Sequence, residues 1–103
     1  MNITLQYFDS CPNWKIADER VRSVIADHGL DAHLQYQLIE SPDEAEKYGF
    51  HGSPTLLVDG VDPFATEDTE VGYACRVYST DSGPAAAPSV QHIAQALVGP
   101  VHG

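Results

Sequence analysis

The chain has 103 residues, 43% of them hydrophobic, so we expect one folded domain over residues 1–103 with a modest core. Fifteen acidic side chains against five basic ones give a formal net charge of -10, which argues against nucleic acid or an anionic membrane surface as partner. No apolar run reaches the roughly 18 residues of a membrane helix, and no signal-peptide pattern opens the chain. These features predict a cytoplasmic protein.

The first third of the chain predicts a strand, a helix and a second strand. Ile3–Phe8 is short, β-branched and aromatic, which is typical of a buried strand. Pro12 suits the first helical position, and Gly29 supplies a left-handed stop. The apolar residues at helical spacing between them are Trp14, Ala17, Val21, Val24 and Ile25. Polar and apolar residues then alternate from His33 to Leu38, which predicts a second strand, parallel to the first.

The remaining elements follow in the order helix, strand, strand, helix. Ser41 is a strong helix cap, and this short helix ends at Gly49. Pro54–Asp59 predicts a third strand and Gly72–Ser79 a fourth, separated by the acidic segment 61–71.

A Gly/Pro/Ala loop over Asp81–Pro88 leads to a last helix, which Ser89 caps and Gly99-Pro100 closes. The apolar face of this helix consists of Val90, Ile93, Ala94 and Leu97. The whole pattern predicts an α/β domain of order β-α-β-α-β-β-α, with a mixed four-stranded sheet flanked by helices.

This order, with Cys11 at the first strand-to-helix junction, resembles the thioredoxin fold. The segment YGFHGSPT, Tyr48–Thr55, resembles the thioredoxin segment Y-G-(I/V)-R-G-(I/V)-P-T. The resemblance implies that Pro54 follows a cis peptide bond and lies beside Cys11. Two positions depart from the family: Trp14 replaces the resolving cysteine, and Ser53 replaces an apolar residue.

A second resemblance is to the organomercurial (alkylmercury) lyases, whose thioredoxin-like core grips mercury with two cysteines from separate segments. GSPTLLV, followed some distance later by ACRVY, is similar to the lyase segment that bears the second of those cysteines. This match implies that Cys11 and Cys75 form the pair. The lyases also use an aspartate three residues after the first cysteine, where this chain has Trp14. Asp9 lies on the other side of Cys11 and does not occupy the matching position.

Cys11 is the strongest catalytic candidate. The N–H groups and dipole at a helix N-terminus favour a thiolate, so we expect Cys11 to be a nucleophile with a lowered pKa. The nearby carboxylate of Asp9 opposes this effect. Cys75 is a second candidate, although a cysteine inside a strand is often a small core residue. An inert buried thiol is the alternative for both cysteines.

The residues expected to shape the site are Pro12, Trp14, His51, Ser53 and Pro54. Trp14 is expected to be a packing anchor rather than a catalytic group. His51 would activate the sulfur if it lay beside Cys11, with an exposed loop histidine as the alternative. Neither the other histidines nor the acidic segment 61–71 shows the spacing of a zinc or calcium site, so no metal and no cofactor is predicted.

Three functional hypotheses follow. The first is a thiol-redox protein, a thiol–disulfide oxidoreductase or a peroxide-reactive thiol protein. It would act on a protein or small-molecule substrate through Cys11, with Cys75 or a thiol of another molecule as the resolving thiol. The second is an organomercurial lyase-like or soft-metal-binding protein that uses both thiols. The third is a non-enzymatic module that binds a protein around Pro54. For the first hypothesis we expect the two thiols to be neighbours, reduced at rest and able to bridge only after some movement.

Overall fold

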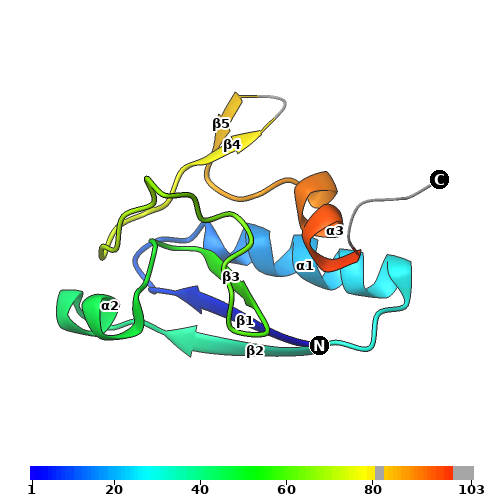
Figure 1. Cartoon of the computed structure of the whole chain (residues 1–103), viewed down its shortest axis with the longest axis horizontal. Coiled ribbons are helices and arrows are strands. Elements are labelled where there is room, and N and C mark those ends of the chain that lie inside the picture. The colour runs from blue at the N-terminus through cyan, green and yellow to red at the C-terminus, as the bar shows by residue number, and fades with distance from the viewer. Residues whose placement is uncertain (81–82, 99–103) are drawn as a thin grey trace.

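A computed structural model describes residues 1–80 and 83–98 and shows a mixed α/β domain (Figure 1). Its elements in chain order are β1 (Asn2–Tyr7), α1 (Trp14–His28), β2 (His33–Leu38), α2 (Pro42–Tyr48), β3 (Thr55–Val58), β4 (Tyr78–Thr80), β5 (Gly83–Ala85) and α3 (Val90–Val98). The first two residues of the predicted loop Asp81–Pro88 and the predicted helix end at Gly99-Pro100 lie outside the described residues. In the described ranges, no helix is long and apolar enough to cross a membrane.

The central sheet has the strand order β2-β1-β3. β1 is parallel to β2, with Ile3 opposite Leu34, and antiparallel to β3, with Ile3 opposite Val58. The predicted parallel pairing of the first two strands is therefore confirmed. The sheet is mixed, as expected, because one of its two pairings is parallel and the other antiparallel.

Glycines end the first two helices where the sequence predicts. Gly29 follows α1 and Gly49 follows α2, both in the left-handed conformation that glycine adopts without a steric penalty. The hydroxyl of Ser41 accepts a hydrogen bond from the Glu44 backbone N–H, so the predicted cap of α2 is present. α1 begins at Trp14 rather than at Pro12, because the Pro12 carbonyl accepts from Lys15 in a separate turn before the helix.

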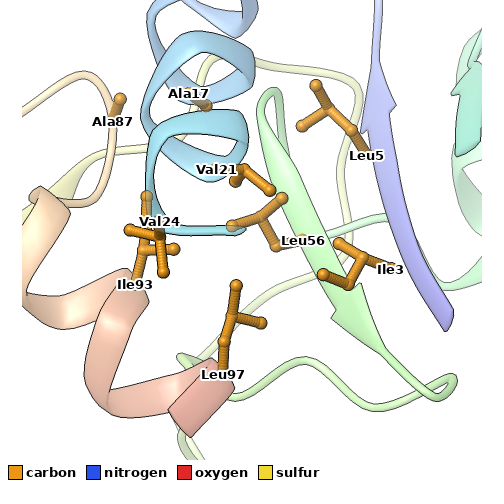
Figure 2. Packing of buried hydrophobic residues seen from close by; sticks show 9 residues of the cluster. All are labelled: Ile3, Leu5, Ala17, Val21, Val24, Leu56, Ala87, Ile93 and Leu97. Atoms are coloured by element: carbon orange, nitrogen blue, oxygen red, sulfur yellow. The ribbon is translucent and has the colours of Figure 1, made fainter. Parts of the chain in front are cut away.

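The main core lies between the sheet and the two longer helices. α1 and α3 lie on the same side of the sheet, and α2 lies near its end (Figure 1). Figure 2 shows Val21 of α1 close to Leu56 of β3, and Val24 close to Ile93 of α3. Burying each of these side chains contributes about 2 kcal/mol. This packing holds α1 against the sheet and so positions the junction between β1 and α1.

A second buried cluster lies where the chain leaves the sheet. It consists of Phe8, Cys11, Ile39, Ala45 and Phe50, with Tyr73 packed against it. The ring of Phe8 meets those of Phe50 and Tyr73, with centroids 6.4 Å and 4.6 Å away. This cluster connects the ends of β1 and β2 to α2, and it encloses the first cysteine.

The predicted four-stranded sheet is wrong. Within the described ranges the sheet has three strands, and most of the predicted fourth strand, Gly72–Ser79, is irregular. Only its end, in β4, is extended, and β4 pairs with β5 in a separate antiparallel hairpin that projects away from the sheet (Figure 1). Neither alternating face of the segment is buried along its length: Cys75 and Val77 are exposed on one face, and Ala74 is exposed on the face that it would share with Tyr78. Without a buried face there is little to hold a full strand against β3.

Candidate functional site

Cys11 lies in the turn between β1 and α1. Its backbone N–H donates to the Phe8 carbonyl at 3.2 Å, which turns the chain over the end of the sheet. The residue is 0% exposed, because the second buried cluster surrounds it. Pro12, the next residue, is exposed. The sequence therefore predicts the correct position of Cys11, between β1 and α1. The structure adds that the residue is buried there.

Two polar groups approach the Cys11 sulfur. The Asn13 side-chain amide donates a hydrogen bond to Cys11 Sγ, with Nδ2 and Sγ 3.6 Å apart. The Ser53 carbonyl oxygen lies 3.9 Å from the same sulfur. The amide favours a negative sulfur, since hydrogen bonds to the charged form of a group stabilise it. Sequence reasoning missed Asn13. The only available signal was an amide side chain two residues after the cysteine.

Ser53 joins three parts of the site. Its hydroxyl accepts from the Phe8 backbone N–H at 3.4 Å, which gives a reason for a polar residue at this buried position. Its backbone N–H donates to the Ala74 carbonyl at 2.8 Å, and its carbonyl accepts from the Arg76 N–H at 2.9 Å. The Ser53–Pro54 peptide bond is cis, as expected from the resemblance. These hydrogen bonds hold residues 74–76 beside the end of β1.

Cys75 pairs with Cys11. The two residues are 64 positions apart in the chain, and the structure joins their sulfurs in a disulfide with a Cα–Cα distance of 6.3 Å. That distance falls in the usual range of about 4.4–6.8 Å. We expected two separate reduced thiols that would meet only after some movement. In this structure the two sulfurs are already joined. The reason is that residues 74–76 run beside Ser53, in an isolated parallel bridge, instead of forming a fourth strand beyond β3.

The two paired cysteines differ in exposure. Cys11 is fully buried, whereas Cys75 is exposed to solvent. Cys75 therefore presents the accessible side of the pair, and Cys11 the enclosed side.

Trp14 lies in the first turn of α1 and packs on a neighbouring ring. Its ring centroid is 4.3 Å from that of Tyr7, and the side chain is packed against the main core. It thus anchors the start of α1 to the end of β1. An indole has no side-chain proton that it readily gives up, so Trp14 contributes shape and no acid–base group to the site.

His51 does not pair with Cys11 in the described structure. Its Nδ1 donates instead to Asp62 Oδ2 at 2.6 Å, and its side chain is only 22% exposed, so it is not an exposed loop histidine either. Arg76 donates to the same oxygen, also at 2.6 Å. Burial by itself would raise the pKa of Asp62, but the hydrogen bonds from His51 and Arg76 hold it below the ordinary value of 3.8.

Arg76 connects this acidic centre to the Pro54 turn. Its guanidinium carbon lies 4.6 Å from the ring centroid of Tyr78, and its NH1 donates to Thr55 Oγ1 at 3.4 Å. The Tyr78 hydroxyl donates to the Pro54 carbonyl, and burial raises the pKa of this phenol strongly. The residues that follow Cys75 are therefore fixed by a buried polar network.

A partly open cavity of about 460 Å³ lies against this network. His51, Arg76 and Tyr78 line it, together with His92 of α3 and Glu70 of the acidic segment. Neither Cys75 nor Cys11 is among the residues that line it.

The acidic segment 61–71 is only partly exposed to solvent. The Asp62 side chain is 3% exposed, whereas Glu67, Asp68 and Glu70 lie at the surface. In the part of the chain that the structure describes, no three His, Cys, Asp or Glu residues are arranged to hold a metal ion. The arrangement instead offers thiol chemistry at the cysteine pair and a structural role for Asp62.

Comparisons of the chain with protein-family models, with curated proteins and with solved structures find no match.

Proposed function

We propose that the chain is a thioredoxin-like thiol-redox protein in which Cys11 and Cys75 form one dithiol–disulfide pair. The observation that carries the proposal is the meeting of these two cysteines beside the Ser53 carbonyl, although 64 positions separate them in the chain. The parallel β1-α1-β2 unit, the antiparallel β3 and the cis bond before Pro54 support the thioredoxin-like part of the proposal.

The proposed reaction is reversible thiol–disulfide exchange. Two substrate thiols reduce the Cys11–Cys75 disulfide, forming one substrate disulfide and two protein thiols, and the two substrate protons pass to the protein sulfurs. In the reverse direction the protein dithiol reduces a substrate disulfide. Both directions run through a mixed disulfide between protein and substrate. The proposed setting is the cytoplasm, whose thiol pools would return the pair to its reduced form between reactions.

Titration with dithiothreitol tests this proposal. Samples equilibrated with oxidised and reduced dithiothreitol are quenched with N-ethylmaleimide, and the numbers of blocked thiols are read by mass spectrometry. We expect a single two-electron transition between a disulfide form and a dithiol form, with no dimer. Reduction of a small disulfide such as bis(2-hydroxyethyl) disulfide should be faster with the native chain than with Cys11→Ser or Cys75→Ser.

The control for that experiment is Asp68→Asn, which changes an exposed residue far along the acidic segment. It should behave as the native chain does. The proposal fails if oxidation gives only intermolecular dimers, or if both cysteine variants reduce the small disulfide as fast as the native chain.

Convergence of the two sulfurs also favours a second candidate function, binding of a soft metal ion by the reduced pair. Two thiolates that reach bonding contact can also hold a thiophilic ion between them. One mercuric ion per reduced chain, lost in both Cys11→Ser and Cys75→Ser, is the expected result. Cleavage of a carbon–mercury bond should be weak at most, because the position of the lyase proton donor holds Trp14.

A further inference from the structure

We infer that substrates enter the pair through Cys75, and that Cys11 is the buried resolving thiol. The inference rests on the proposed function and goes beyond it by assigning different roles to the two sulfurs. This order is the opposite of the one that the position of Cys11 in the sequence leads us to expect.

Exposure is the first observation behind this order. Thiol–disulfide exchange requires the attacking sulfur to touch the sulfur that it attacks. Cys11 is 0% exposed, and Phe8, Ile39 and Phe50 of its cluster are buried with it. Cys75 is exposed, as are Ala74 before it and Val77 two residues later. An external thiolate or disulfide therefore meets Cys75 at the surface, whereas reaching Cys11 would require opening the cluster.

Stabilisation of the displaced sulfur is the second observation. Attack on Cys75 expels Cys11 as a thiolate, and a better stabilised thiolate leaves faster. The Asn13 amide already donates to Cys11 Sγ at 3.6 Å, and α1 begins at the next residue, so its positive N-terminal end is close to that sulfur. These two groups offset part of the cost of a negative charge at a buried position, a cost to which the Ser53 carbonyl oxygen, 3.9 Å from the sulfur, adds. Asn13 is thus a positioning residue for the resolving thiol.

Each step of the exchange forms one disulfide bond and breaks another. A substrate thiolate attacks Cys75 Sγ, a bond forms between these sulfurs, and the Cys11–Cys75 bond breaks with its electron pair on Cys11. A second substrate thiolate then attacks the substrate sulfur of the mixed disulfide and releases Cys75 as a thiolate. Both protein thiolates take up the protons that the two substrate thiols lost. In the reverse direction Cys75 attacks a substrate disulfide, and Cys11 then displaces the substrate from Cys75.

The mixed disulfide decides between the two orders. The oxidised native chain is treated briefly with limiting 2-mercaptoethanol, quenched with acid, blocked with N-ethylmaleimide and digested with trypsin. The digest separates the cysteines, because Cys11 lies in the peptide 1–15 and Cys75 in the peptide 48–76. We expect the mercaptoethanol adduct on Cys75 and the maleimide on Cys11, in at least about tenfold excess over the opposite product.

Labelling rates give an independent measurement that does not depend on the disulfide. Iodoacetamide should modify the Cys75 peptide of the reduced native chain faster than the Cys11 peptide, by about tenfold or more. In urea the two rates should converge, since both thiols are then exposed. Using the native chain avoids the risk that a cysteine variant misfolds.

The two experiments separate the order of attack from the existence of the redox pair. A predominant adduct on Cys11, or faster native labelling of Cys11, overturns the order and leaves the proposed redox pair intact. Failure of the native chain to form any internal disulfide overturns the proposed function, and with it the inference.

Discussion

The carboxylate of Asp62 lies 2.6 Å from the guanidinium of Arg76, and their side chains are only 3% and 8% exposed. This ion pair joins the start of the acidic segment to the residue that follows Cys75. Because the pair is buried, removing one partner should lower the free energy of unfolding more than removing one partner of a surface ion pair would.

Replacing Asp62 with Asn should destabilise the fold. Asp62→Asn leaves the Arg76 charge buried without its counter-ion, so we expect a loss of about 3 kcal/mol in the free energy of unfolding, measured in urea. Asp68→Asn, a surface change in the same segment, should stay within about 0.5 kcal/mol of the native chain. Equal stability of the two variants would show that the Asp62–Arg76 pair has no net stabilising role.

The contribution of Asp62 should also depend on pH. Burial opposes its ionisation, but hydrogen bonds from His51 and Arg76 lower its pKa below the ordinary 3.8 in the folded chain. A lowered folded-state pKa means that the stabilisation is present above the unfolded value and is lost as the pH falls through the folded value. The stability difference between the native chain and Asp62→Asn should therefore be constant above about pH 5 and shrink below about pH 4. A difference that widens on acidification would contradict this assignment.

Gly52→Ala should loosen the contact between the Pro54 turn and residues 74–76. Gly52 has a φ of 103°, and an added Cβ would lie 3.0 Å from the Ala74 carbonyl oxygen and 3.1 Å from Arg76 Cβ. We expect a loss of about 2 kcal/mol in stability and a disulfide that dithiothreitol reduces more readily. Gly72→Ala is the matched control, since its Cβ would meet nothing within 4 Å. If both alanine variants keep the native reduction equilibrium, the close contact of Gly52 with residues 74–76 does not stabilise the disulfide.

Asn13→Ala should raise the pKa of the Cys11 thiol. In a Cys75→Ser background, Cys11 is the single thiol, and its ionisation can be followed by the ultraviolet absorbance of the thiolate. Loss of the 3.6 Å hydrogen bond should raise this pKa, because the bond stabilises the charged form of the sulfur. Asn2→Ala, which removes an exposed amide away from the site, should leave the titration unchanged. An unchanged titration in Asn13→Ala would remove Asn13 from the site.

Local signals in the sequence were sufficient for the elements that build the scaffold. Apolar periodicity identified β1, α1 and β2, and Gly29 and Gly49 marked the helix ends because the left-handed conformation is a property of one residue. The turn at Pro54 was found through its resemblance to a family segment.

The parts that failed depend on contacts between distant residues. Residues 72–77 alternate well enough to suggest a strand, yet their path is set by hydrogen bonds to Ser53, which no local pattern encodes. Nothing local in the sequence distinguishes Asp62 from the other acidic residues of its segment, because its partners, His51 and Arg76, lie 11 and 14 positions away. The burial of Cys11 likewise depends on residues that only the folded chain brings around it.

The disulfide between Cys11 and Cys75 also changes the result of proteolytic cleavage of the chain. The bond closes a ring that contains α1, β2, α2, β3 and the whole acidic segment 61–71, while β1 and α3 remain outside it. A protease that cleaves at the exposed Glu67 or Asp68 cuts inside this ring. The oxidised chain would then remain one covalent molecule, whereas the reduced chain would become two fragments held only by packing. The redox state of this one disulfide therefore decides whether cleavage in the acidic segment leaves the two fragments covalently joined.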